Sequence, residues 1–245
     1  PAPRGAPPRR ALSAPPPAAG ETPLPFPRSL AVARRLVRSG ADALILEGME
    51  AGGHIGAVAT SVLAQEILPH LDEVPVFVAG GIGTREAIAA YLRMGAAGVQ
   101  IGTMFVCAEE SIAHPRFKEA FVRAAARDAV PSVQLDPEFK VIPVRALANA
   151  GTRRFAELQL EVIARHRRGE MSYEDASLAI EHFWAGALRR AVIDGDVETG
   201  SLMAGQSVGL VDRIRPAAAI LADLITGAEA ALAREPAAAP AVAAA

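Results

Sequence analysis

Apolar positions from residue 29 onward alternate between short continuous runs and helically spaced stripes. Three runs are typical of strands, because buried parallel strands are apolar on both faces. They are residues 43–46, 75–79 and 98–101. Between and before them, the spacing predicts helices that begin at Ser29, Ser61 and Thr84. Strands that alternate with helices predict parallel βα units of an α/β fold.

Each predicted strand leads directly into glycine. These glycines are Gly48, Gly80, Gly81 and Gly102. The strand spacing suits either a TIM barrel or a doubly wound sheet. Glycine at every strand end favours the barrel, because the loops after its strands share one rim where ligands bind.

The pattern changes after residue 107, where helical spacing dominates. It predicts helices at residues 115–126, 153–166 and 173–193, with a proline-rich loop between the first two. We therefore expect four parts and a tail. They are a disordered proline-rich leader (1–27), the strand-bearing part (28–107), a helical lid or subdomain (108–199), a closing barrel segment with a helix (200–235), and a disordered alanine-rich tail (236–245).

Composition excludes several classes of protein. The 25 Lys and Arg against 27 Asp and Glu give a net charge of −2. The chain therefore lacks the excess of positive charge that attracts the phosphate backbone of nucleic acids. No stretch offers the roughly 20 uninterrupted apolar residues of a membrane helix. The single cysteine, Cys107, forms neither an internal disulfide nor a cysteine metal site, and the five histidines lack metal-ligand spacing. We expect a soluble, cytoplasmic protein without a metal.

Two glycine turns are candidates for binding a phosphate group. Gly80 and Gly81 stand between a buried strand and a helix start, and Gly102 and Thr103 end the next strand. Exposed backbone N–H groups at such turns bind anions. The spacing is not that of the dinucleotide fingerprint. Tight turns without a ligand remain the alternative.

Two further segments combine glycines with polar side chains. Residues 47–56 contain Gly52 and Gly53 and aim one imidazole, His54, at whatever approaches the loop. The alternative is a loop histidine satisfied by local hydrogen bonds. Around Gln206 and Ser207, small residues indicate close backbone approach, either to a ligand or within a packed turn.

Taken together, these segments resemble the nitronate monooxygenase family, which shares a flavin-binding TIM barrel with the FMN-dependent enoyl-ACP reductase. The resemblance covers residues 29–230. It implies an FMN whose phosphate contacts the two glycine turns, with His54 as the catalytic residue beside flavin and substrate. The cofactor-binding residues that we predict are Gly52, Gly53, Gly80, Gly81, Gly102, Thr103, Gln206 and Ser207.

The family resemblance leaves the reaction open between related chemistries. In nitronate-oxidising members the histidine acts on the acidic carbon of the substrate, and the flavin passes electrons to oxygen. In reductase members NAD(P)H reduces the flavin, which then reduces an enoyl thioester or a quinone. A non-catalytic barrel fragment is the third reading. The oligomeric state stays open, a homo-oligomer included.

Two departures from the family pattern affect these expectations. Met104 stands where the family usually has Arg before Phe, so an ion pair is missing there. The strands match only the last three βα units, and residues 23–27 are proline-rich where strand five is expected. The chain also begins at Pro1 without a methionine. We therefore expect a truncated, incomplete TIM barrel with a helical subdomain, which by itself binds FMN weakly or not at all.

Overall fold

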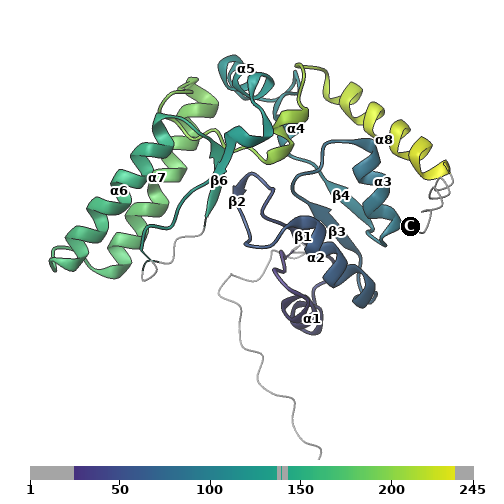
Figure 1. Cartoon of the computed structure of the whole chain (residues 1–245), viewed down its shortest axis with the longest axis horizontal. Coiled ribbons are helices and arrows are strands. Elements are labelled where there is room, and N and C mark those ends of the chain that lie inside the picture. Colours follow the sequence, from purple (N-terminus) through teal and green to yellow (C-terminus); the bar gives the residue numbers. More distant parts are fainter. Residues whose placement is uncertain (1–24, 137–138, 140–142, 235–245) are drawn as a thin grey trace, which may run out of the picture.

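The computed structural model describes residues 25–136, 139 and 143–234. Within them the chain forms an α/β fold with two regions (Figure 1). One region is a parallel sheet covered by helices. The other is a long helical pair that packs on a small antiparallel sheet. The strand β2 and the helices α4 and α5 lie where the two regions meet.

A three-stranded parallel sheet confirms the three predicted strands. It consists of β1 (Leu44–Glu47), β3 (Val76–Ala79) and β4 (Gly98–Gln100), in the order β1-β3-β4. Leu44 pairs with Val76, and Val78 pairs with Val99. Because all three strands are parallel, their carboxyl ends lie at one edge of the sheet.

Helices cover the outer face of this sheet. They are α1 (Leu30–Arg38), α2 (Thr60–Ile67), α3 (Arg85–Arg93) and α8 (Ala217–Ala233). The Ser29 side chain accepts a hydrogen bond from the Val32 N–H, and the Thr84 side chain does so from Ala87, so both predicted caps are confirmed. Leu44, Leu46 and Val78 are fully buried in the core below these helices.

The start of α2 differs from the prediction. The helix begins at Thr60 rather than after a Ser61 cap, and its N-cap residue, Ala59, has no side-chain acceptor. The carboxylate of Glu50 takes that role, because it accepts hydrogen bonds from the Thr60 N–H at 2.7 Å and the Thr60 hydroxyl at 2.8 Å. A residue ten positions upstream therefore caps this helix, and local spacing could not indicate it.

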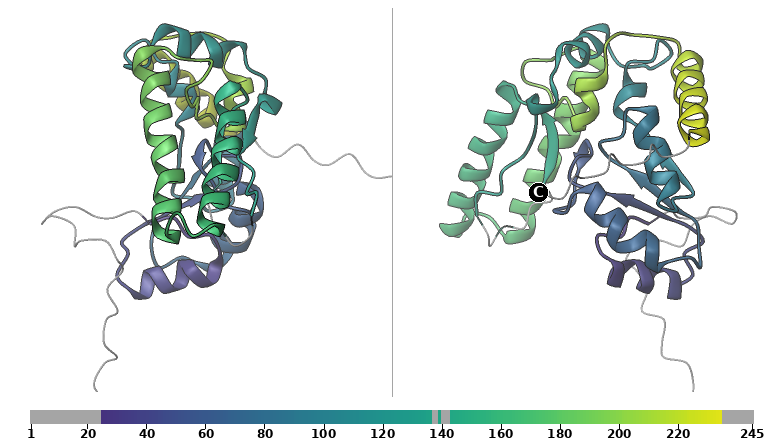
Figure 2. Two further views of the ribbon diagram at one scale, coloured as in Figure 1. Left: turned by 90° about the vertical axis from the view of Figure 1, so that its left-hand side faces the viewer. Right: turned by 45° about the vertical axis from the view of Figure 1, so that its right-hand side comes forward.

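The second region is built on two long helices, α6 (Ala150–Arg167) and α7 (Tyr173–Asp194), which run side by side (Figure 2). Phe155, Val162 and Ile180 form its separate buried core. The cap of α7 is Ser172, and the helix ends at Gly195, which adopts the left-handed conformation at φ 73°. Serine and glycine are the residue types that these two positions favour.

The proline-rich loop expected between the helices at 115–126 and 153–166 contains regular structure that its sequence did not indicate. The expected loop contains β5 (Ala129–Pro131) and β6 (Val144–Leu147), and β6 pairs with both β5 and the distant β2 (Gly53–His54). The strands have only two to four residues, β5 ends at Pro131 and β6 directly follows Pro143. The pairing of β2 with β6 joins residues about 90 positions apart, which no local pattern reveals.

Shorter helices complete the described chain. They are α4 (Thr103–Val106), α5 (Pro115–Arg123) and the 3-10 helices η1 (Leu68–His70), η2 (Ala126–Asp128) and η3 (Gln206–Leu210). Within the described ranges, no helix combines the length and apolar character needed to span a bilayer.

The two predicted disordered ends fall almost entirely outside the described residues. The exception is the end of the leader. The Pro25 carbonyl accepts a hydrogen bond from the Ile45 N–H at 3.1 Å, and Pro27 is buried. Residues 25–27 therefore lie beside β1, which corrects their assignment to a disordered leader.

Candidate active site

A cavity of about 240 Å³ lies at the carboxyl ends of the three parallel strands. Seven of the nine predicted site residues line it, and two do not. Those lining it are Gly52, Gly53, Gly80, Gly81, Gly102, Thr103 and Ser207. The structure therefore brings together glycine turns that lie far apart in the sequence.

The positions of Gly80 and Gly81 accept only glycine, which has no side chain. Both adopt positive φ angles, 91° and 75°, in the region that favours glycine. A Cβ at Gly81 would lie 2.9 Å from the Cβ of Glu50, and one at Gly80 would lie 3.1 Å from the Ala51 nitrogen. The turn after β3 thus packs closely against the loop after β1.

The two turns leave backbone donors available at the cavity. Among the hydrogen bonds of the described residues, none uses the backbone N–H of Gly81, Ile82, Gly102 or Thr103, and all four residues line the cavity. A Cβ at Gly102 would meet no atom within 4 Å. Free N–H groups beside open space form a cradle that suits an anionic group such as a phosphate.

The loop after β1 is held by long-range hydrogen bonds. Besides capping α2, Glu50 accepts the Gln206 N–H through its backbone carbonyl at 2.9 Å. Arg145 of β6 is buried and donates from Nε to the Met49 carbonyl at 2.9 Å. Burial lowers the pKa of Arg145, and the nearby charge of Glu50 opposes that shift. These contacts fix the loop against both regions of the molecule.

The sequence around Gln206 and Ser207 suggested either close approach to a ligand or a packed turn, and the segment has features of both. A Cβ at Gly205 would lie 2.8 Å from the Glu50 carbonyl oxygen, so this is a closely packed turn. Ser207 also lines the cavity, but Gln206 does not. The Thr103 hydroxyl accepts a hydrogen bond from the Gly205 N–H at 3.0 Å, so it ties this segment to the turn after β4.

His54 stands beside the cavity rather than among the residues that line it. It lies on β2 directly after Gly53, opposite Val144 of β6. Its Nε2 is 3.8 Å from Oε2 of Glu181 on α7, and about half of each side chain is exposed. The imidazole is thus accessible and has a carboxylate neighbour from the helical region.

Seven residues that line the cavity were not among the predicted site residues, and three of them, Glu47, Gln100 and Met203, have long side chains that are polar or contain sulfur. Glu47 ends β1, and burial raises the pKa of its carboxyl group although the charge of Arg28 opposes this. A signal for it was present, because Glu47 is the polar residue that directly follows the buried run 43–46. Met203 comes from a distant loop and carried no such signal.

Other candidate groups have structural roles. Cys107 is buried, and burial raises the pKa of its thiol to about 11, so it stays protonated at neutral pH. His114 caps α5 by accepting a hydrogen bond from the Arg116 N–H. In the part of the chain that the structure describes, no group of three or more His, Cys, Asp or Glu side chains could hold a metal ion.

Comparison with known proteins gives a consistent match. A family model described as nitronate monooxygenase matches residues 6–227. A protein described as putative monooxygenase Rv1533, from Mycobacterium tuberculosis, is 33% identical over 195 residues, which cover 79% of this chain and 49% of that protein.

Two solved structures are similar over most of this chain. FabK from Thermotoga maritima has a TM-score of 0.71 and 38% identity, and the match covers 84% of this chain and 60% of FabK. Nitroalkane oxidase from Streptomyces ansochromogenes has a TM-score of 0.64 and 27% identity, with 84% and 57% covered. The chain thus spans about half to three fifths of the length of these relatives.

Proposed function

Because the chain belongs to the nitronate monooxygenase family, we propose that it is an FMN-dependent oxidoreductase that oxidises alkyl nitronates with O₂. One observation carries the proposal. The two glycine turns converge on a single cavity with four uncommitted backbone N–H groups. Such a cradle fits the phosphate of FMN, which is anionic and accepts several hydrogen bonds.

The residues that line the cavity divide into two groups in this proposal. The N–H groups of Gly81, Ile82, Gly102 and Thr103 would hold the phosphate, and Gly52, Gly53 and Ser207 would lie beside the remainder of the cofactor. FMN supplies the redox chemistry when bound, whereas the protein positions it and the substrate.

His54 is the residue that we propose to act on the substrate. A neutral imidazole both accepts and donates protons near pH 7. In this proposal it stabilises the nitronate anion, or it takes the proton from the acidic carbon of the neutral nitroalkane that gives this anion. Its accessible position directly after the cavity-lining Gly53 supports this role.

We expect the isolated chain to bind FMN weakly. The cavity of about 240 Å³ lies below the roughly 300–1,000 Å³ typical of complete ligand pockets. The three parallel strands provide only one wall of a binding site. In this proposal the glycine turns hold the phosphate of FMN, whereas its ring system has few contacts with the protein. Stoichiometric yellow flavin retained by a cooperatively folded monomer through gel filtration would contradict this expectation.

A second candidate function is an NAD(P)H-dependent reductase of enoyl thioesters or quinones. The 38% identity to FabK favours it, and the cradle and His54 serve both reactions equally well. Oxygen uptake with a nitronate in the absence of NADH supports the first function. NADH consumption with an enoyl thioester or quinone supports the second, and a chain inactive in both assays is a non-catalytic fragment.

A binding experiment tests the site without relying on activity. Flavin fluorescence is titrated with the full chain, using FMN in one series and riboflavin, which lacks the phosphate, in the other. We expect FMN to bind at least about tenfold more tightly, because the cradle contacts only the phosphate. Equal affinity for the two flavins would refute the phosphate assignment.

A further inference from the structure

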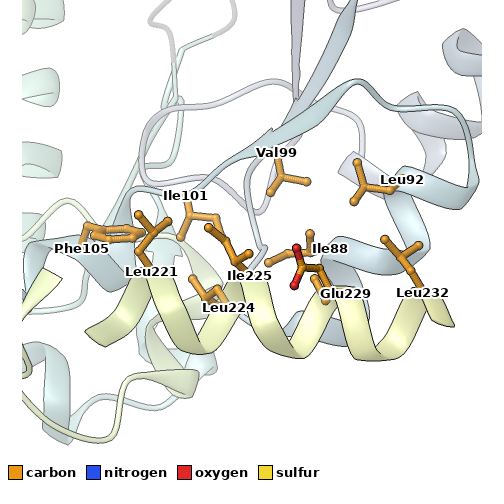
Figure 3. Close-up of a pocket in the computed structure, with 11 residues that line it drawn as sticks. Ile88, Leu92, Val99, Ile101, Phe105, Leu221, Leu224, Ile225, Glu229 and Leu232 are labelled. Atoms are coloured by element: carbon orange, nitrogen blue, oxygen red, sulfur yellow. The ribbon is translucent and has the colours of Figure 1, made fainter. Parts of the chain in front are cut away.

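An apolar groove and an ion pair lie outside the proposed contacts with FMN. The groove has a volume of about 330 Å³ and lies between α3, β4 and α8 (Figure 3). Glu229 is the one charged residue that lines it, so the groove offers little for proton transfer. The ion pair joins His54 of β2 to Glu181 of α7, and it therefore concerns the residue that we propose to act on the substrate.

The sheet fixes the backbone at His54 but not its side chain. His54 pairs with Val144 of β6, and the Ile55 N–H donates a hydrogen bond to the Pro143 carbonyl at 2.9 Å. These contacts hold the Cα atom of His54 in place. The side chain is 52% exposed, so packing alone leaves the ring free to rotate. The orientation of the imidazole therefore depends on the polar groups that it meets.

Glu181 is the ionic partner of this imidazole. Its Oε2 lies 3.8 Å from Nε2 of His54, and within the described residues the His54 side chain has no other ion pair or hydrogen bond. The distance is within the range of an ion pair but is longer than a hydrogen bond. The interaction is therefore mainly electrostatic.

The packing of α7 places the Glu181 carboxylate at this point. Ile180 and Ala176, on the same helix, are buried in the core of the helical region. On the other side of Glu181, the ring of Phe183 packs against that of Phe155, with ring centroids 5.3 Å apart. The helix is thus anchored before and after Glu181, so the carboxylate reaches His54 from a fixed support.

We propose that Glu181 is a positioning residue for His54, an inference that rests on the proposed function. Its negative charge favours the neutral imidazole that carries its proton on Nε2, the nitrogen that faces Glu181. The lone pair is then on Nδ1, which accepts the proton from the acidic carbon of a neutral nitroalkane. The C–H bond breaks, its electron pair stays on the substrate as the nitronate anion, and the carboxylate stabilises the imidazolium that forms.

The substrate decides whether this role is needed. A neutral nitroalkane must lose a proton to His54, whereas a nitronate is already deprotonated. Glu181 therefore affects oxidation of the first substrate and not of the second. About half of each side chain is exposed, so water and salt weaken the interaction, and we expect an effect of about two- to fivefold.

Nitrogen NMR tests the pairing without flavin or turnover. The full chain is labelled with ¹⁵N-histidine, and the His54 signals are assigned with His54→Gln. In alkaline solution the ¹⁵N shifts give the ratio of the two neutral forms of the imidazole. We expect Glu181→Met to lower the ratio of the form protonated on Nε2 to the other form by about twofold. The control Glu174→Met should leave it unchanged, because Glu174 is exposed about two turns earlier on α7.

Kinetics tests the role in the reaction. With FMN added in excess, oxygen uptake is measured with a neutral nitroalkane and with its preformed nitronate. Glu181→Met should lower kcat/KM for the nitroalkane by about two- to fivefold and leave that for the nitronate unchanged. Raising NaCl to about 1 M should narrow the difference between wild type and variant, because salt screens exposed charges.

The two experiments separate this inference from the proposed function. An unchanged NMR ratio in Glu181→Met, or an equal change in Glu174→Met, overturns the inference. Equal losses with both substrates also overturn it, because they reflect damage to the cofactor site rather than an effect through His54. Thermal melting of each variant checks that it is folded. A wild type that oxidises neither substrate contradicts the proposed function, whereas the NMR ratio still decides whether Glu181 controls His54.

Discussion

At the residue scale, a substitution at Gly102 should affect binding in the cavity without affecting the stability of the fold. Its φ of −105° is accessible to any residue, and a Cβ there meets only open space. We predict that Gly102→Ala leaves the free energy of unfolding unchanged within about 0.5 kcal/mol. It should weaken FMN binding at least about tenfold, or about 1.4 kcal/mol, because the methyl group occupies the proposed phosphate position.

Fluorescence titration and chemical denaturation check both parts of this prediction. Gly186→Ala is the matched control, because Gly186 lies on α7 away from this cavity and its Cβ would make only an ordinary contact at 3.7 Å. If Gly102→Ala binds FMN as the wild type does, the phosphate does not lie at this turn.

Glu47 gives the stability of the protein a dependence on pH. Burial raises the pKa of its carboxyl group in the folded state, so folding favours the protonated form. The unfolded chain therefore binds fewer protons, and stability falls as pH rises from the ordinary pKa through the raised one. Glu47→Gln removes this loss, since a neutral amide replaces the charge.

Urea denaturation at pH 4 and at pH 8 measures the effect of Glu47. We expect Glu47→Gln to gain stability relative to the wild type at pH 8, and to gain less or nothing at pH 4. A difference between variant and wild type that is the same at both pH values would show that the burial of Glu47 does not affect folding.

At the residue scale the sequence also predicted seven of the fourteen residues that line the cavity. Gly80, Gly81 and Gly102 were recognisable because they directly follow predicted strands, and Gly52 and Gly53 because they lie in the glycine-rich loop 47–56. The side chains were harder to place. His54 lies beside the cavity and Gln206 outside it, because their directions depend on β6 and Glu50, which contact them from elsewhere in the chain.

At the element scale, α2 depends on a cap that comes from another loop. The Glu50 carboxylate accepts two hydrogen bonds from Thr60, which is buried. We predict that Glu50→Ala lowers the free energy of unfolding by about 1–3 kcal/mol, since it leaves polar groups of a buried residue without their acceptor. Glu119→Ala on the exposed surface of α5 should change it by less than about 0.5 kcal/mol.

Denaturant unfolding of both variants measures this difference. A Glu50→Ala variant as stable as Glu119→Ala would show that the Thr60 donors find other partners. The helices α1 and α3, in contrast, begin where the sequence predicts, because their caps, Ser29 and Thr84, are adjacent to the helices that they start.

At the scale of the whole molecule, two hydrophobic cores are joined through the loop after β1. One core lies below the parallel sheet, and the other lies between α6, α7 and β6. Arg145 reaches from the second region to the Met49 and Ala129 carbonyls, and Gln206 binds Glu50 from the other side. The cavity therefore depends on both regions being in place.

The sequence by itself determined the parallel βα units, the helix caps next to their own helices, and the glycines at the strand ends. These features follow from local periodicity and from the backbone freedom of glycine, which neighbouring residues reveal. Only the tertiary structure decided the pairing of β2 with β6, the Glu50 cap on α2, and the presence of Met203 at the cavity. Those features arise from contacts between segments tens of residues apart, whose strength depends on packing that no local pattern encodes.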